Sequence, residues 1–159
     1  KHWILRSYLQ VFLLQGFFMI TIAYPLFIFD PEFSPNLGIR DYAGILIWLI
    51  GFFFEAMGDA QMRSFKLNPA NKGHIMRNGL WKYTRHPNYF GEATMWWGLF
   101  VIASSNPSGY LAVFSPVIIT FLLVRVSGVP MLEKKYASNP EYQDYIKKTS
   151  AFIPLPPMR

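Results

Sequence analysis

Residues 7–29 read SYLQVFLLQGFFMITIAYPLFIF, a run of 23 residues without a charged side chain. At about 1.5 Å of rise per residue, a helix of this length reaches roughly 34 Å, which is enough to cross the hydrocarbon core of a bilayer. The run is too long for a signal peptide, and no small-residue cleavage site follows it. The sequence therefore predicts a first membrane span over residues 7–29.

The same pattern returns three times. Tyr42–Phe54 is uncharged, and helix-forming residues continue to Phe65. Residues 93–124 are also uncharged and are interrupted only by the polar stretch at 104–109, which indicates two helices and a tight turn. We expect further spans over 42–65, 88–104 and 107–127, then a tail over 128–159 that contains a short helix from Glu141 to Thr149.

The composition agrees with a membrane protein. Of the 159 residues, 52% are apolar and 15% are charged, against about 25% charged in soluble domains. The absence of cysteine excludes disulfides, thiolate metal sites and cysteine nucleophiles, and the three histidines lack partners at metal-binding spacing, so we expect no metal site. The predicted fold is all-α: one membrane domain, a polytopic integral membrane helix bundle of four spans with a short cytosolic C-terminal helix.

The formal net charge of +6 is explained by topology. Placing the amino end, residues 59–87 and residues 125–159 on one side of the membrane collects 14 of the 15 Lys and Arg residues and leaves Arg40 opposite. The positive-inside rule makes that side cytoplasmic, with both termini of this segment inside. A nucleic-acid partner is not expected, because the sequence has too little polar surface for a basic globular domain.

The stretch GLWKYTRHPNYFGE, residues 79–92, lies across the cytosolic mouth of the third span. The proline after His86 suits a first helical turn, so free N–H groups would face the cytosol beside Arg85 and His86 and form an anion site. Asn88 and Glu92 share a helix face, and a carboxylate at this depth needs a partner or a polar cavity. In the alternative, Arg85 and His86 meet lipid headgroups and Glu92 forms a structural ion pair.

The second span carries another ionisable face, because Glu55, Asp59 and Arg63 recur at four-residue spacing and Lys66 follows. If exposed, an Asp59–Arg63 pair is worth only a few tenths of a kcal/mol. Two carboxylates in the last membrane turns are better explained by a cavity shared with Glu92. We therefore favour a cavity over an exposed ion pair.

The tail places further polar and aromatic side chains on the same side of the membrane, among them Glu133, Tyr136 and Tyr145. Its lysines can serve topology and its tyrosines can act as interfacial anchors. Alternatively, the tail and residues 59–87 together enclose a large anionic ligand.

Three motifs resemble one family. Asp59-Ala-Gln61, the stretch at 79–92 and the ending Glu133…Tyr142…Tyr145…Phe152-Ile-Pro resemble the DUF1295 group of bacterial membrane proteins, relatives of the steroid 5α-reductases, over essentially the whole chain. The Arg-His-Pro-x-Tyr core alone is also similar to isoprenylcysteine carboxyl methyltransferases and sterol C14 reductases. The resemblance implies a multi-pass protein of the bacterial inner membrane. It also implies that helices upstream of Lys1, which carry the groups that polarise the substrate carbonyl, are missing here.

The resemblance implies NADPH-dependent reduction of a conjugated double bond in a 3-oxo-4-ene steroid or a similar hydrophobic enone. Asn88 and Glu92 would contact the nicotinamide end of the cofactor, and Tyr89 and Glu92 would be catalytic. An arginine occupies the position near His74 in human-type members. The expected cofactor-binding residues are Asp59, Arg63, Lys66, His74, Arg85, His86, Asn88, Glu92, Glu133, Tyr136 and Tyr145.

Two other classes compete with the reductase. A methyltransferase that uses S-adenosylmethionine would also need a cytosolic pocket, but its cofactor has no phosphates, which leaves less work for Arg63, Lys66, Arg77 and Arg85 together. A non-enzymatic membrane scaffold would use these charges for topology alone, and three ionisable groups at membrane depth argue against it. A reductase whose partners are a hydrophobic small molecule and membrane lipid is the favoured prediction.

Overall fold

The computed structural model describes residues 3–28 and 36–158. Within these residues the regular structure is helical, apart from one isolated parallel bridge between Thr84 and Ser150. The α-helices are α1 (Trp3–Ser7), α2 (Leu14–Ile22), α3 (Tyr24–Ile28), α4 (Ile39–Leu67), α5 (Pro87–Ala103), α6 (Phe114–Phe121), α7 (Val129–Lys135) and α8 (Pro140–Lys148). A π-helical segment, Tyr8–Leu13, joins α1 to α2, and another, Leu122–Val126, follows α6.

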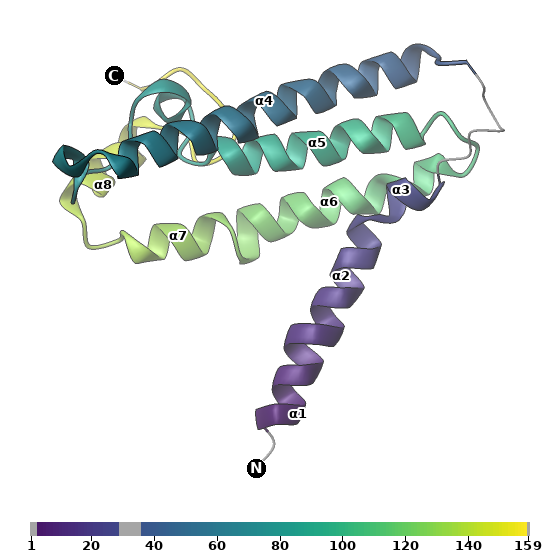
Figure 1. Cartoon of the computed structure of the whole chain (residues 1–159), viewed down its shortest axis with the longest axis horizontal. Helices are drawn as coiled ribbons and strands as arrows, with labels where there is room; N and C mark the ends of the chain where they lie inside the picture. The colour runs from purple at the N-terminus through teal and green to yellow at the C-terminus, as the bar shows by residue number, and fades with distance from the viewer. Residues whose placement is uncertain (1–2, 29–35, 159) are drawn as a thin grey trace.

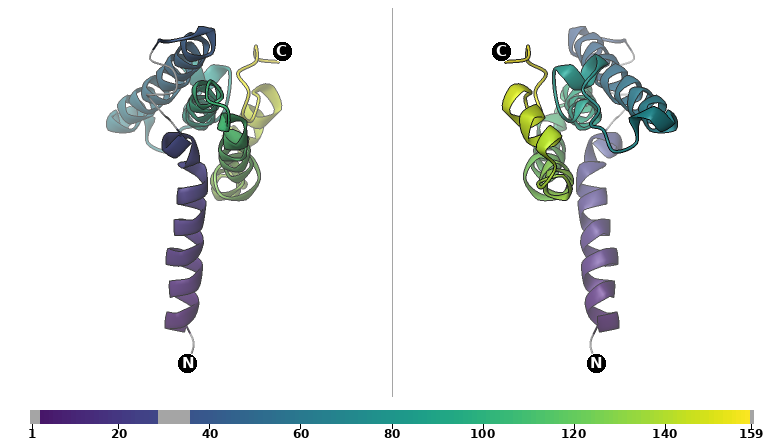
Figure 2. Two further views of the ribbon diagram at one scale, coloured as in Figure 1. Left: turned by 90° about the vertical axis from the view of Figure 1, so that its right-hand side faces the viewer. Right: turned by 90° about the vertical axis from the view of Figure 1, so that its left-hand side faces the viewer.

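Three long rods lie side by side, namely α4, α5 and the continuous pair α6–α7 (Figure 1). The rod made of α1 and α2 leaves the others at a steep angle, as both side views show (Figure 2). It meets α6 at its carboxyl end, where the buried hydroxyl of Ser115 donates to the Ile22 carbonyl. The carboxyl end of α4, the start of α5, α7 and α8 gather at the opposite end of the molecule from α3 (Figure 1).

Glycines bring α4 and α5 into backbone contact. Gly44, Gly51 and Gly58 recur every seven residues of α4, two helical turns apart, and Gly91 and Gly98 repeat this spacing on α5. A Cβ atom added to Gly51 would lie 2.7 Å from the Gly91 carbonyl oxygen, and one added to Gly98 would lie 2.7 Å from that of Gly44. Small residues permit such close approach between membrane helices, where dispersion contacts supply much of the attraction.

Polar contacts fix the start of α4 to the turn after α5. The buried Asp41 carboxylate accepts hydrogen bonds from the Gly38 N–H at 2.7 Å and the Ser105 hydroxyl at 2.9 Å. Arg40 donates to the Ser104 carbonyl at 2.8 Å. The turn that follows α5 therefore holds the end of the helix pair at which α4 begins.

The helices differ from the expected spans at two places. Instead of one helix over 7–29, helix begins at Trp3, α2 ends at Ile22, and the short α3 follows a turn at Ala23. The break precedes Pro25, whose ring nitrogen cannot donate to the preceding turn. The expected end at Phe29 lies outside the described residues.

The fourth rod also extends further than expected. Helix begins with a 3₁₀ turn at Gly109–Val113 and, after a bend at Gly128, continues as α7 to Lys135, so the tail does not begin at residue 128. Pro130 lies in the first turn of α7, where a missing N–H costs nothing, and helix can therefore restart.

Three helical rods among the described residues are long and apolar enough to cross a membrane: Trp3–Ile22, Ile39–Leu67 and Gly109–Lys135. These rods support an integral membrane protein. Helix α5 has 17 residues and packs along α4. The four-span count and the cytoplasmic placement of the termini stay predictions.

Candidate functional site

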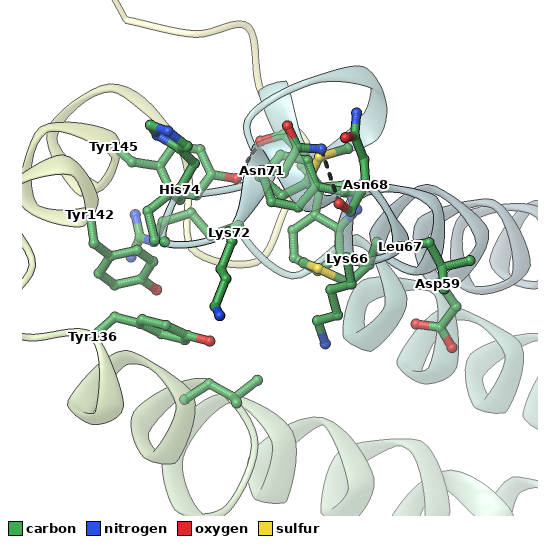
Figure 3. Close-up of a pocket in the computed structure, with 18 of the residues that line it drawn as sticks. Asp59, Lys66, Leu67, Asn68, Asn71, Lys72, His74, Tyr136, Tyr142 and Tyr145 are labelled. Carbon is green, nitrogen blue, oxygen red and sulfur yellow. Dashed lines mark hydrogen bonds between the residues drawn. The ribbon is translucent and has the colours of Figure 1, made fainter.

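A pocket of about 530 Å³ lies where α4 ends and α5 begins. The last turns of α4, the loop at 68–76, the start of α5, α7 and α8 all contribute to its lining (Figure 3). Its volume falls within the range of about 300–1,000 Å³ that small-molecule and cofactor sites occupy. The lining includes eight of the residues expected to bind a cofactor: Asp59, Lys66, His74, Arg85, His86, Asn88, Tyr136 and Tyr145.

Two lysines supply unpaired positive charge to this pocket. Lys66 comes from the last turn of α4 and Lys72 from the following loop, and both side chains project into the space that α7 borders (Figure 3). Neither lysine forms an ion pair with any described residue. Their ammonium groups are therefore available to an anionic ligand. Lys72 was not among the residues predicted from sequence.

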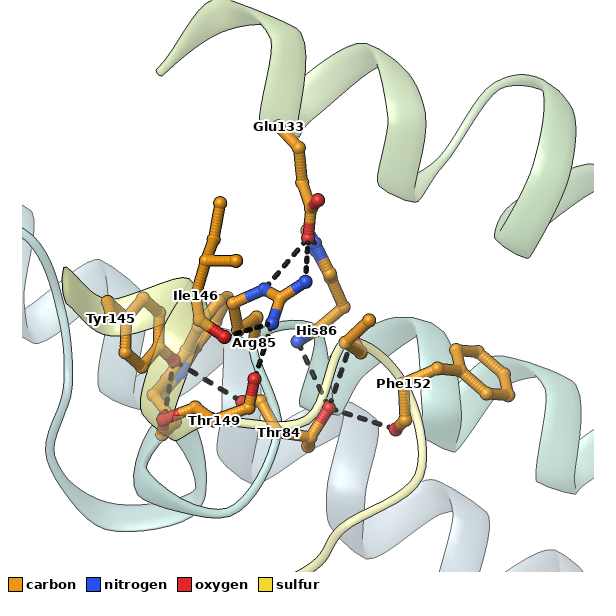
Figure 4. Close-up of polar contacts among 10 residues, drawn as sticks. Thr84, Arg85, His86, Glu133, Tyr145, Ile146, Thr149 and Phe152 are labelled. Atoms are coloured by element: carbon orange, nitrogen blue, oxygen red, sulfur yellow. Dashed lines mark hydrogen bonds and ion pairs between the residues drawn. The ribbon is translucent and has the colours of Figure 1, made fainter. Parts of the chain in front are cut away.

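Arg85 contacts other groups of the protein, whereas the sequence predicted an anion beside it. Its guanidinium is buried and reaches one Glu133 carboxylate oxygen from Nε at 2.8 Å and from Nη2 at 2.7 Å (Figure 4). Nη1 donates to the carbonyls of Ile146, at 3.3 Å, and Thr149. Arg85 thus joins α7 and the end of α8 to the segment that precedes α5, and it acts as part of the pocket wall.

The tail runs beside the segment that precedes α5. The Arg85 N–H donates to the Ser150 carbonyl at 2.8 Å, and the Thr84 hydroxyl donates to the Phe152 carbonyl at 2.9 Å (Figure 4). The buried Tyr145 hydroxyl donates to the Trp81 carbonyl, so burial and this hydrogen bond keep its proton in place. Burial raises the pKa of Tyr145 above its ordinary value. These bonds make the tail a fixed wall of the pocket.

His86 presents an unsatisfied nitrogen at the pocket. The side chain is 3% exposed, its Nε2 lies 3.5 Å from a Glu133 oxygen, and its Nδ1 has no hydrogen-bond partner among the described residues. Burial lowers the pKa of His86, although Glu133 opposes this effect, so a neutral imidazole is favoured. The ring stacks on Tyr89 with centroids 5.4 Å apart. A buried nitrogen without a partner is unfavourable, and a bound ligand would relieve that cost.

The loop between α4 and α5 is held on two sides. Arg77 donates to an Asp144 carboxylate oxygen at 3.0 Å and to the Glu141 carbonyl at 2.7 Å, and His74 Nδ1 lies 3.5 Å from a Glu141 oxygen. On the α4 side, the Gln61 side chain accepts from the Leu80 N–H at 2.9 Å. This contact gives the Asp-x-Gln motif a structural role.

A hydrogen bond also connects Trp81, in the stretch at 79–92, to α4. The Trp81 indole N–H donates to the Gly58 carbonyl at 3.1 Å. Gly79 adopts φ +62° in the turn before it, a conformation that glycine tolerates best. The stretch at 79–92 therefore folds against α4 before it enters α5.

Four predicted site residues do not line the pocket: Arg63, Tyr89, Glu92 and Glu133. Arg63 is exposed, and Glu133 is engaged by Arg85. Glu92 lies one helical turn after Asn88, close enough to Asp59 for the two charges to interact, and Glu55 feels both. Of the three carboxylates for which a shared cavity was expected, only Asp59 lines the described pocket, and the shared cavity stays a prediction.

Comparisons with known proteins identify relatives of the chain. A family profile described as "Protein of unknown function (DUF1295)" matches residues 1–149. Mouse 3-oxo-5-alpha-steroid 4-dehydrogenase 1 is 30% identical over 113 residues, which cover 70% of this chain and 41% of the relative. The bovine protein of the same name is 31% identical over 118 residues, covering 73% and 42%. The chain thus spans about two fifths of the length of these relatives.

A shorter match points to a second chemistry. The "Probable O-methyltransferase ustE" of Ustilaginoidea virens is 36% identical over 63 residues, which cover 40% of this chain and 22% of the relative. No solved structure matches the chain.

Proposed function

Because the chain belongs to the DUF1295 family and is related to the steroid 5α-reductases, we propose that it is a membrane-embedded, NADPH-dependent reductase of a conjugated double bond. Its substrate is a 3-oxo-4-ene steroid or a similar hydrophobic enone. The observation that carries the proposal is the pocket in which the unpaired Lys66 and Lys72 lie beside the start of α5. The pocket faces the cytoplasm, where both termini of the segment also lie.

The residues present suit NADPH. Its phosphates require cations, which Lys66 and Lys72 supply. Asn88 and Asp59 occupy the end of the pocket nearest Glu92, and they hold the nicotinamide. The rings of Tyr136 and Tyr142, with centroids 5.4 Å apart, accommodate the adenosine.

Each remaining site residue serves this arrangement. Arg85 and Glu133 are positioning residues that hold α7 and the tail around the cofactor, and Tyr145 fixes the tail to Trp81. Arg63 lies outside the described lining, where its charge attracts the anionic cofactor before it enters, and His74 lies in the lining.

NADPH, when bound, supplies the hydride that adds to the β-carbon of the enone, and a proton added to the α-carbon completes the saturated product. As the hydride arrives, negative charge develops on the substrate carbonyl, and hydrogen-bond donors must meet it. The Asn88 amide orients the reactive end, and Glu92, one turn deeper in α5 and outside the described pocket lining, places a further acidic group beside Asp59. The Tyr89 hydroxyl delivers the proton, with its ring held in place by the buried His86.

A second candidate is transfer of a methyl group from S-adenosylmethionine. The match to the probable O-methyltransferase favours it. S-adenosylmethionine carries a positive sulfonium, one carboxylate and no phosphate, so it leaves less for two free lysines in one pocket to bind. The reductase therefore explains more of the charge in the site.

Transfer of deuterium tests the proposed function. The purified chain in lipid nanodiscs receives NADPH deuterated at the transferred position together with a 3-oxo-4-ene steroid, and the products are analysed by mass spectrometry. We expect a saturated ketone that carries one deuterium and one solvent proton. Asn88→Ala and Tyr89→Phe should abolish it, whereas Trp97→Phe, on an exposed part of α5, should retain it.

Two results would contradict the reductase. One is a chain that fails to bind NADPH at all, since the cofactor pocket is formed by residues present here. The other is transfer of a labelled methyl group from S-adenosylmethionine to a lipid, which would assign the chain to the methyltransferases.

A further inference from the structure

The side chains of the pocket follow a clear order. Figure 3 shows Tyr136 and Tyr142 at one end, then Lys72, then Lys66, and Asp59 at the other end. Aromatic rings, one cation, a second cation and an acid succeed each other along the cavity. Asn88 belongs to the Asp59 end because its backbone nitrogen lies 3.2 Å from a Cβ atom added to the adjacent Gly58. This sequence of groups matches the order of adenine, adenosine ribose, pyrophosphate and nicotinamide in a dinucleotide.

Lys72 is held over the pocket by its local backbone. Its N–H donates to the Pro69 carbonyl at 3.2 Å, and the His74 N–H donates to the Asn71 carbonyl at 3.0 Å. Gly73 adopts φ +88° and turns the chain immediately after Lys72. The loop is tied to α8 through Arg77 and Asp144 at 3.0 Å. Lys72 therefore projects from a turn whose backbone is fixed by hydrogen bonds.

The acids of the pocket are as informative as its cations. A site for NADH uses a carboxylate to bind the 2′-hydroxyl of the adenosine ribose, whereas a site for NADPH places a cation near the 2′-phosphate. Among the described lining residues, Asp59 is the one acid, and it lies at the opposite end from Tyr136. The adenosine end of the described lining thus carries Lys72 without a carboxylate, and the nearby Glu141, outside the lining, is paired with Arg77 and His74.

We propose that Lys72 selects NADPH over NADH by pairing with the 2′-phosphate of the adenosine ribose, whereas Lys66 binds the pyrophosphate that both cofactors share. This inference rests on the proposed function, because it takes the pocket to be the dinucleotide site. It adds a residue that determines specificity, on a loop outside both sequence motifs that flank it.

Equilibrium binding tests the inference without turnover. The full chain in detergent is titrated with NADPH, NADH, and 2′,5′-ADP as a probe of the 2′-phosphate site. Lys72→Gln should weaken NADPH and 2′,5′-ADP by about 10- to 100-fold, as expected for one charge-assisted hydrogen bond, and leave NADH within about twofold. Lys66→Gln should weaken NADPH and NADH alike. Lys82→Gln, an exposed lysine outside the pocket lining, is the matched control and should change neither.

The outcomes distinguish failure of the Lys72 assignment from failure of the proposed function. Equal weakening of NADPH and NADH by Lys72→Gln would overturn the inference, as would unchanged NADPH binding, while the dinucleotide site would stand. A wild-type chain that binds neither dinucleotide would overturn both. Preserved 2′,5′-ADP binding in Lys72→Gln would place the 2′-phosphate elsewhere and reject the assignment.

Discussion

Replacing Gly91 with alanine tests whether backbone contact between α4 and α5 positions the site. The new Cβ atom would lie 2.4 Å from the Glu55 backbone nitrogen and 2.5 Å from the Gly51 carbonyl oxygen. Both contacts involve backbone, so a side-chain rotation cannot relieve them. Restoring an ordinary contact of 3.4 Å or more requires the helices to separate locally by about 1 Å.

The expected loss of stability combines two opposing effects. Overpacking of a close-packed interface costs about 1–3 kcal/mol. Alanine is favoured over glycine within a helix by about 1 kcal/mol, which offsets part of that cost. Because both clashes are with backbone atoms, the cost lies in the upper part of this range, at about 2–3 kcal/mol, and we expect Gly91→Ala to lower the free energy of unfolding by about 1–2 kcal/mol. The corresponding fall in Tm is about 2–8 °C for a domain of this size.

Thermal unfolding in detergent, followed by tryptophan fluorescence, measures this loss. Gly16→Ala is the matched control, because a Cβ atom there has no neighbouring heavy atom within 4 Å and the site is also helical. It should leave Tm unchanged or raise it slightly. Separation of the helices also shifts Asn88 relative to Asp59, so NADPH binding should weaken in Gly91→Ala alone. Equal Tm values for the two variants would refute the packing argument.

Three further predictions concern the wall of the pocket. Arg85→Gln leaves Glu133 without its partner and should lower the free energy of unfolding by about 3 kcal/mol in a denaturant titration. A loss below about 1 kcal/mol would contradict the role of Arg85 in joining α7 and α8 to the segment before α5. Burial lowers the pKa of His86, so its contribution to stability is complete above about pH 6.5 and is lost as the pH falls through the lower folded-state pKa. His86→Gln should therefore flatten the acid dependence of Tm. An unchanged dependence would show that His86 is not the group responsible. Tyr145→Phe removes the donor to the Trp81 carbonyl and should cost about 1–3 kcal/mol with faster proteolysis of the tail, whereas wild-type resistance would show that the bond is dispensable.

Long uncharged runs allowed the helices to be predicted from sequence. The predicted spans at 42–65 and 88–104 agree with α4 and α5 to within a few residues, because hydropathy and Pro87 mark their ends. The break before Pro25 was underestimated because a proline inside a membrane span can either kink a helix or end it, and only its neighbours decide. Here the neighbour is Ser115, whose hydroxyl donates to the Ile22 carbonyl, and sequence alone does not reveal this contact.

The site was predicted less completely than the fold. Lys66, Asn88 and Asp59 line one pocket, since helix spacing brings them to one end of α4 and α5, and their binding of a cofactor stays a prediction. The contacts of Arg85 with Glu133 and the tail depend on how α8 folds back, which no local pattern specifies. Lys72 was missed because a lysine in a polar loop reads as a solvated residue.

The seven-residue spacing of glycines on α4 was a usable signal for the helix pair. Glycines at 44, 51 and 58 recur in register with those at 91 and 98, and such spacing places small residues on one helix face. The resulting close approach sets the distance between Asp59 and α5, so it belongs to the site as much as to the fold.

A structure of the chain determined with NADP⁺ bound would show whether the pocket is a dinucleotide site. We expect the nicotinamide against Asn88, the pyrophosphate at Lys66 and the adenosine beside Tyr136, with the 2′-phosphate at Lys72. An empty pocket at saturating cofactor would refute the proposed site, and so would a dinucleotide bound in the reverse orientation.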